Sequence, residues 1–394
     1  MLAMRSQKEI QKKIQDEMKK EGIGALILTR AESIFYATGY ASQFLYTMQQ
    51  AGIAYAIIPD SGQCELIVSN FEKQTAELQC SGVGISQYDS WVFVDDGTDE
   101  IKEKSTDFSG NQSFEIIKKI IKKIGSGIKI GIETNSLNGQ FMEQFGRDFG
   151  KENLVDCAPL INAVRSIKTS WEIQMLRESA QIAEKTMRLT AKDIKPGMTE
   201  FDVRALYRKN ADIVNKNIIE TLVVISIGPN YSAAYIPRDY ILKEGDIIRL
   251  DGGVNYYGYR SDIARTFVLG GKPNAVQQKK YEALVIGFKK GLSMIKPGVA
   301  FSKVFEETQQ TIREAGIPNY VRGHVGHSIS VEMGIEEAPY VAETQKGVFK
   351  EGMVLCFECP YYSTIGGYNI EDTLLITKDG IELFTHANET LIWP

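Results

Sequence analysis

The sequence predicts an α/β domain over about the first 160 residues, followed by a larger domain made of two related halves. Two observations lead to this prediction. Strand-like and helix-like segments alternate up to about residue 160, and a weak internal repeat runs from there to the carboxyl end. The length of 394 residues is consistent with two domains, because a typical domain has about 100–200 residues. A content of 43% hydrophobic and 24% charged residues excludes a disordered or collagen-like chain.

The first domain is predicted from apolar runs and helical patterns. The runs predict strands at residues 25–28, 54–58, 65–68 and 128–132. Apolar residues repeat at helical spacing from Ile10 to Met18, and FEIIKKIIKKI (114–124) places its isoleucines in one stripe of a helix. The polar stretch 95–113 is predicted to be an exposed loop or a short surface helix. This alternation predicts a mixed sheet.

A long helix is predicted to begin the second domain just after Arg165. Thr169 or Ser170 precedes Glu172, and a hydroxyl residue followed by early acidic charge is typical of a helix N-terminus.

The two halves of the second domain are related by three pairs of matching segments. These are IKPG at 194–197 and 295–298, LKEGDIIRLD (242–251) and FKEGMVLCFE (349–358), and DIARTFVL (262–269) and EDTLLIT (371–377). Each half therefore carries a turn, a strand that ends in a carboxylate and a second strand that begins with one. The alternative is a chance similarity between two β-hairpins.

Charge and composition exclude several function classes. The 45 basic and 50 acidic residues give a net charge of −5, which provides no basic surface for nucleic acid or an anionic membrane. No apolar run reaches the roughly 18–20 residues that span a bilayer, and the charged amino terminus does not resemble a secretory signal. Five dispersed cysteines do not indicate a disulfide framework. We therefore expect a soluble, cytoplasmic protein.

Four carboxylates stand at the ends of the repeated strands: Asp251, Asp262, Glu358 and Glu371. Gathered in one place they would repel one another, and several would have to bind protons. Two divalent metals would remove this conflict. The chain has only three histidines, and His327 would supply a single nitrogen ligand. Such a ligand set suits Mn²⁺, Co²⁺, Zn²⁺ or Fe²⁺ without selecting one. The alternative is four unrelated surface carboxylates at hairpin ends.

The segments LDGGVNYYGYRSDIARTF, GHSIS, CFECP and NIEDTLLIT resemble, in this order, the motifs of the pita-bread metallopeptidases, especially prolidase and aminopeptidase P. ESIFYATGY (32–40) is similar to an early segment of their amino-terminal domain, so the resemblance covers essentially the whole chain. It implies a creatinase/prolidase-like domain over residues 1–160. It also implies an α+β pita-bread catalytic domain over residues 161–394, with two pseudo-symmetric halves around a metal-binding cleft.

The resemblance also implies a role for each ligand position. Asp251 would bind one metal, and His327 and Glu358 would bind the other. Asp262 and Glu371 would bridge the two metals, and Glu358 would also act as the general acid/base. The implied reaction is attack of a metal-bridging hydroxide on a small peptide, catalysed by a Xaa-Pro dipeptidase or aminopeptidase. The implied protein is a homodimer with two divalent metals per site.

Three positions depart from the family pattern. Ala234 and Gly334 stand where histidines are usual, and Asn369 replaces an arginine two residues before Glu371. Loss of one donor that stabilises an oxyanion typically lowers the rate of acyl chemistry by about 10²–10³. The alternative function is therefore a metal-dependent non-peptidase of the same family, such as a C–N hydrolase or a lyase acting on a small molecule. An inactive binding module is a further alternative, which the five retained ligand positions disfavour.

His324 stands three residues before His327, whereas the extra histidine of the family more often stands four before it. We predict it as a second catalytic residue beside Glu358. A supporting partner of a ligand side chain and a purely structural histidine are the other interpretations. Strand alternation places Cys356 on the same face as Glu358, where it either lines the metal pocket or is buried as a small apolar residue. Arg260, in GYRSD, is predicted to be exposed on a loop.

Overall fold

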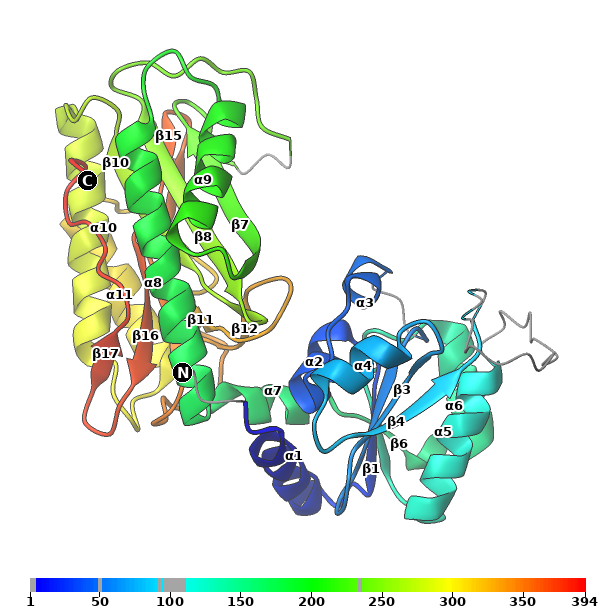
Figure 1. Cartoon of the computed structure of the whole chain (residues 1–394). Helices are drawn as coiled ribbons and strands as arrows, with labels where there is room; N and C mark the ends of the chain where they lie inside the picture. The colour runs from blue at the N-terminus through cyan, green and yellow to red at the C-terminus, as the bar shows by residue number, and fades with distance from the viewer. Residues whose placement is uncertain (1–4, 49–51, 91, 93, 95–110, 233–235) are drawn as a thin grey trace. The chain divides into compact units, whose positions relative to one another are not determined.

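The computed structural model describes residues 5–48, 52–90, 92, 94, 111–232 and 236–394 (Figure 1). The chain divides into two compact units, Met1–Arg165 and Ser166–Pro394. The predicted fold class is confirmed: an α/β unit is followed by a unit of two similar halves. No helix in the described part of the chain is long and apolar enough to cross a membrane.

The first unit is built on a mixed sheet whose described strands run in the order β4-β3-β2-β1-β5-β6. Their bounds are β1 (Ala25–Leu28), β2 (Tyr55–Pro59), β3 (Glu65–Ser69), β4 (Gly84–Tyr88), β5 (Ile130–Ile132) and β6 (Leu154–Asp156). Strand β1 pairs antiparallel with β2 and parallel with β5. The four predicted apolar runs coincide with β1, β2, β3 and β5.

The helices of the first unit are α1 (Gln7–Glu21), α2 (Ala31–Thr38), α3 (Gln43–Met48), α4 (Lys73–Gln79), α5 (Asn111–Ile124), α6 (Gly139–Phe149) and α7 (Ala158–Ser166), with the short 3₁₀-helix η1 (Lys151–Asn153). The isoleucine stripe of α5 is buried as predicted, since Ile117 and Ile121 belong to one apolar cluster with Ile27 and Ile57. Of the predicted loop at 95–113, residues 95–110 lie outside the described residues and the last three belong to α5.

The second unit is built on a sheet of nine described strands. Seven follow the path β12-β11-β13-β16-β10-β8-β7, while β17 pairs with β16 and β9 pairs with β8. Their bounds are β7 (Ile218–Ile227), β8 (Ile247–Tyr256), β9 (Tyr259–Arg260), β10 (Ile263–Val268), β11 (Gly326–Ser328), β12 (Glu337–Tyr340), β13 (Val354–Glu358), β16 (Glu371–Ile376) and β17 (Ile381–Leu383). A separate hairpin joins β14 (Tyr361–Ser363) to β15 (Gly366–Tyr368).

The helices of the second unit are α8 (Ser170–Asp193), α9 (Glu200–Val214), α10 (Ala275–Met294) and α11 (Phe301–Ala315). Thr169 is the N-cap of α8. Its hydroxyl accepts the N–H of Glu172 at 3.2 Å, and the carboxylate of Glu172 accepts the N–H of Thr169 at 2.8 Å. This reciprocal capping box stabilises the helix start predicted from the sequence.

The repeat found in the sequence is a structural repeat. In the first half, the N–H of Gly197 donates to the carbonyl of Leu242 at 2.8 Å. In the second half, the N–H of Gly298 donates to the carbonyl of Phe349 at 2.9 Å. The two glycines have φ of +92° and +85°, a left-handed conformation that favours glycine at this turn in both halves.

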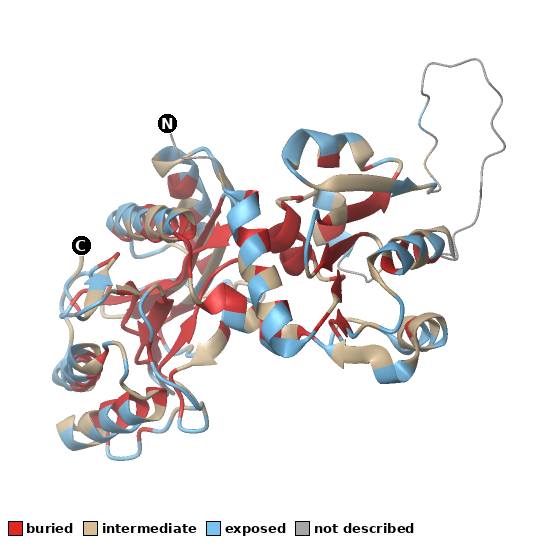
Figure 2. Ribbon diagram, turned by 90° about the horizontal axis from the view of Figure 1, so that it is seen from below, coloured by how far each residue is buried: buried red, intermediate tan, exposed pale blue. Residues whose placement is uncertain are grey.

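Each half packs its own pair of helices against its own strands. Met187 of α8 and Tyr207 of α9 share an apolar cluster with Ile248 of β8. In the other half, the ring of Phe288 in α10 lies 5.6 Å from that of Phe357 in β13. Figure 2 shows buried residues concentrated in the strands and on the inner faces of the helices. The two halves therefore share one continuous sheet, and the candidate site lies where they join.

Candidate metal centre

The two hairpins meet at the pairing of β10 with β16, and this contact brings the predicted carboxylates together. Asp251 of β8 is opposite Ala264 of β10, which is opposite Glu371 of β16, which is opposite Glu358 of β13. Directly opposed residues of an antiparallel sheet project from the same face. Asp262 precedes Ala264 by two residues and therefore shares that face.

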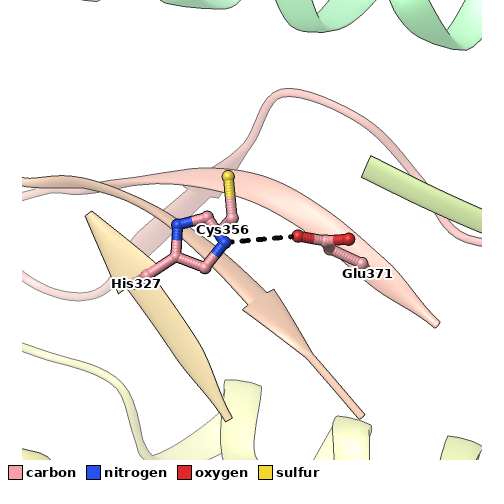
Figure 3. A group of neighbouring side chains, drawn as sticks. All are labelled: His327, Cys356 and Glu371. Carbon is pink, nitrogen blue, oxygen red and sulfur yellow. Dashed lines mark ion pairs between the residues drawn. The ribbon is translucent and has the colours of Figure 1, made fainter. Parts of the chain in front are cut away.

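His327 reaches the same group of side chains from β11. It is opposite Cys356, which precedes Glu358 by two residues. Its Nε2 lies 3.6 Å from Oδ2 of Asp262 and 3.8 Å from Oε1 of Glu371. Figure 3 shows the imidazole of His327 and the carboxylate of Glu371 facing each other, with Cys356 beside them. The structure thus gathers His327, Asp262 and Glu371 in one place.

Two overlapping groups of potential ligand atoms share Glu371. Atoms of Asp251, Asp262 and Glu371 lie within 4.8 Å of one another, as do atoms of His327, Cys356 and Glu371. Nitrogen and oxygen ligands lie about 2.0–2.2 Å from a metal such as zinc, so two ligands of one ion are separated by about 3–4.4 Å. The separations of 3.6 Å and 3.8 Å between His327 and the carboxylates of Asp262 and Glu371 fall in this range, so these side chains are spaced as ligands of a divalent metal could be.

Burial makes this cluster costly without a cation. Burial and the charge of Asp251 raise the pKa of Asp262 well above its usual range, and burial and the charge of Asp262 do the same for Glu371. Burial also raises the pKa of Asp251. Oδ1 of Asp262 and Oε1 of Glu371 are buried and accept no hydrogen bond from the described residues. Buried oxygens that lack donors fit a divalent metal, which would supply the missing positive charge.

Glu358 lies at the edge of this cluster, among basic and polar groups. It accepts a hydrogen bond from Nη2 of Arg322 at 3.3 Å, and Nδ1 of His324 lies 3.5 Å from its Oε1. The other ring nitrogen of His324 is 3.3 Å from Oε2 of Glu336. His324 is therefore placed between Glu358 and Glu336, beside a predicted ligand and in the position expected of a supporting partner.

Asn369 occupies the centre of the carboxylate group. Its Nδ2 donates toward Oδ2 of Asp251 at 3.2 Å, Oε2 of Glu358 at 3.1 Å and Oε2 of Glu371 at 3.4 Å. A neutral amide thus stands where the family pattern has a cationic arginine. It offers donors to three carboxylates but does not neutralise their charge.

Cys356 is fully buried on the face that strand alternation predicts. Its thiol donates to the backbone carbonyl of Asp262 at 3.3 Å, and burial raises its pKa well above the usual range. The thiol therefore stays protonated and supports the backbone of Asp262.

A cavity of about 570 Å³ opens beside the cluster. Its lining includes the predicted residues Asp251, Asp262, His327 and Glu358, together with Gly334. Gly334 has no positive φ, and an added Cβ would meet no heavy atom within 4 Å. A larger side chain at this position would therefore project into open space. Ala234 lies outside the described residues.

Sequence reasoning missed three charged residues of this cavity, Arg249, Arg322 and Glu336. A signal existed for Arg249, because it precedes Asp251 by two residues in the same strand and shares its face. Arg322 and Glu336 lie in loops, and no periodicity could have found them. The prediction for Arg260 was wrong: it is 2% exposed, lies on β9 and pairs with Glu220 at 3.2 Å.

Two known protein families match the chain. Residues 174–378 match the family described as metallopeptidase family M24. The chain belongs to metallopeptidase family M24. Residues 11–167 match the creatinase/prolidase amino-terminal domain. The predicted family is confirmed.

Individual relatives include Xaa-Pro dipeptidases and uncharacterized peptidases. The Xaa-Pro dipeptidase of Pyrococcus horikoshii is 32% identical over 239 residues, which are 59% of this chain and 66% of that protein. An uncharacterized peptidase of Bacillus subtilis is 30% identical over 245 residues, which are 61% of this chain and 67% of that protein. The alignments thus span about two thirds of the length of these relatives.

Solved structures match over nearly the whole chain. The prolidase from Pyrococcus horikoshii has a TM-score of 0.78 at 25% identity, covering 98% of this chain and 100% of that chain. The Xaa-Pro dipeptidase from Bacillus anthracis has a TM-score of 0.81 at 24% identity, covering 98% and 99% of the two chains. The X-Pro aminopeptidase from Thermotoga maritima, at 19% identity and a TM-score of 0.78, shares the fold.

Proposed function

We propose that this chain is a Xaa-Pro dipeptidase of the prolidase type that uses two divalent metals. The observation that carries the proposal is the convergence of Asp251, Asp262, Glu371 and His327, with Glu371 common to both groups of ligand atoms. The dipeptidase activity is taken from the names of the relatives in Pyrococcus.

In this proposal Asp251 would help to hold one metal, His327 and Glu358 would help to hold the other, and Asp262 and Glu371 would contribute to both. Bound metals of this kind lower the pKa of water and polarise a substrate carbonyl. Mn²⁺, Co²⁺, Zn²⁺ and Fe²⁺ all accept this donor set. The five side chains would hold the ions in a largely buried site, which strengthens every electrostatic interaction there.

Glu358 is the proposed general acid/base, because it combines a ligand position with a place in the cavity lining. Arg322 and Asn369 donate to its two oxygens and would fix its orientation. Oε1 would take the proton from the attacking water and return it to the leaving nitrogen. His324 stands 3.5 Å from that oxygen and would help to position it.

The alternative, a metal-dependent non-peptidase of the same family, is favoured by one observation. Gly334 lines the cavity without a side chain, at a position where the family pattern has a histidine. A peptide carbonyl would therefore lack one of its usual donors, and Ala234 removes a second. We expect weak cleavage of ordinary Xaa-Pro peptides, below about 10⁴ M⁻¹s⁻¹ in kcat/KM.

The experiment measures kcat/KM on Xaa-Pro dipeptides after loading with Mn²⁺, Co²⁺ or Zn²⁺ in turn. Measurable hydrolysis that Glu358→Gln abolishes would support the proposal. The double variant Ala234→His with Gly334→His should increase the rate, and open space beside Gly334 favours its folding. A parent value of about 10⁴ M⁻¹s⁻¹ or more would show that the site works without the histidines. No hydrolysis by the metal-loaded parent or double variant would contradict the dipeptidase proposal.

A further inference from the structure

Two arginines line the candidate cavity from different parts of the fold. Arg249 comes from β8, and Arg322 comes from the loop between α11 and β11. Both guanidinium groups lie over the ring of Tyr362, at 5.0 Å and 5.8 Å from its centroid. Tyr362 also lines the cavity, so an aromatic ring holds two cationic groups beside the carboxylate cluster.

Both arginines have buried N–H groups that donate to no acceptor in the described part of the chain. Arg249 is only 2% exposed, yet its Nε and Nη1 donate to no acceptor among the described residues. Its nearest charged partner is Oδ2 of Asp251, at 3.6 Å from Nη1. Arg322 donates from Nη2 to Glu358, while its buried Nε has no partner in the described chain. Buried donors without acceptors are costly, and where they line an open cavity, as these two arginines do, they are placed to bind a ligand oxygen.

The charge of the loaded site points to an anion. Asp251, Asp262, Glu358 and Glu371 carry four negative charges when ionised, and two divalent cations would cancel them. Glu336, which also lines the cavity, adds one negative charge, so the two arginines leave the loaded site with a net charge of about +1. Guanidinium groups bind carboxylates through paired, charge-assisted hydrogen bonds. A cavity of about 570 Å³ is within the range of small-molecule sites.

We propose that Arg249 and Arg322 bind a carboxylate of the substrate and thereby select short, anionic substrates. This inference rests on the proposed function, because it concerns the same cavity. The carboxylate could be the free carboxyl terminus of a dipeptide or an acidic side chain. In either case the arginines recognise the substrate and take no part in binding the metals.

The first experiment measures binding without turnover. Calorimetry on the metal-loaded protein compares L-proline with L-prolinamide, which differ in the carboxylate. The parent should prefer proline by about tenfold or more. Arg322→Gln and Arg249→Gln should each reduce this preference to about threefold or less, with metal content unchanged. If Arg249→Gln fails to fold or to bind metal, the preference of Arg322→Gln for proline over prolinamide tests the inference, because the half-buried Arg322 is less embedded in the fold.

Arg260 provides a matched control. It precedes Asp262 by two residues as Arg249 precedes Asp251, and it is equally buried at 2% exposure. It pairs with Glu220 and is absent from the cavity lining. Arg260→Gln should therefore leave the preference for proline over prolinamide unchanged.

The second experiment identifies the source of the carboxylate by turnover. It compares kcat and KM for Ala-Pro, Ala-Pro amide and Glu-Pro amide. A carboxyl-terminal source predicts a low KM only for Ala-Pro, whereas a side-chain source predicts a low KM only for Glu-Pro amide. In both cases Arg249→Gln should raise KM more than it lowers kcat, whereas Arg322→Gln should raise KM and also lower kcat, because Arg322 donates to Glu358.

The outcomes separate this inference from the proposed function. Equal binding of proline and prolinamide, binding of neither, or a preference that survives both arginine substitutions would overturn the inference, even if Xaa-Pro peptides are hydrolysed. A preference that the substitutions remove would support it, even if no peptide is cleaved and the dipeptidase proposal fails.

Discussion

Asn369→Asp should destabilise the metal-free protein in a manner that depends on pH. The substitution exchanges the amide donor for a carboxylate within 3.4 Å of oxygens of Asp251, Glu358 and Glu371. Unit charges about 4 Å apart repel by about 4 kcal/mol at an effective dielectric constant of 20, so the introduced group would bind a proton instead. Its pKa in the folded protein is therefore raised above the unfolded value of about 3.9.

The magnitude follows from that protonation. Each pH unit above the unfolded pKa costs about 1.36 kcal/mol, so the destabilisation can reach about 4 kcal/mol at pH 7 and about 1.5 kcal/mol at pH 5. Because the folded state of this variant binds more protons than the unfolded state, its stability falls as pH rises. Asn369→Ala, which removes only the donors, should cost about 1.5–3 kcal/mol with a smaller dependence on pH.

The assay is urea unfolding in the presence of a chelator, followed by tryptophan fluorescence. A Trp91→Phe background leaves Trp171 and Trp393, both in the unit Ser166–Pro394, so the signal reports on the unit that carries Asn369. Saturating Mn²⁺ should restore part of the lost free energy of unfolding, since cations neutralise the added charge. The reasoning would be refuted if the free energy of unfolding that Asn369→Asp removes did not increase between pH 5 and pH 7, because the three carboxylates could then not surround residue 369 as described.

Further predictions concern the metals, the packing and the domain boundary. Asp262→Ala should abolish joint occupancy by two metals in elemental analysis, because Asp262 is a proposed bridge; two metals bound as tightly as in the parent would exclude that role. Metal affinity should increase with pH by up to about tenfold per unit for each proton displaced, because the pKa values of Asp262 and Glu371 are raised and these protons must leave; calorimetric affinities that are equal at pH 5.5 and 7.5 would contradict this. Gly291→Ala should lower stability by about 1–3 kcal/mol in urea unfolding, since its Cβ would overlap the Phe357 ring and the Thr308 hydroxyl, whereas Gly380→Ala meets open space and serves as the control. Residues 166–394 expressed alone should fold and bind metal, as measured by circular dichroism and metal analysis; loss of metal binding would show that the first unit helps to build the site.

The local features of the fold could be predicted from the sequence alone. A continuous apolar run located β1, and helical periodicity located the buried stripe of α5, because both signals depend only on residues close together in the chain. The cap at Thr169 was predictable because its hydrogen bonds join residues three apart. The repeated turns and the order of the ligand positions are also visible in the chain, and they indicate the family.

The tertiary structure decided which of these residues meet and what surrounds them. The pairing of Ala264 with Glu371 joins strands more than 100 residues apart, and it places Glu371 between the two ligand groups. Asn369 was noticed as a departure, but its three carboxylate neighbours depend on that same pairing. Arg322 enters the cavity from a loop, and Arg260 is buried on β9, where it pairs with Glu220. Register and loop placement arise from contacts between distant segments, and no local pattern in the chain encodes them.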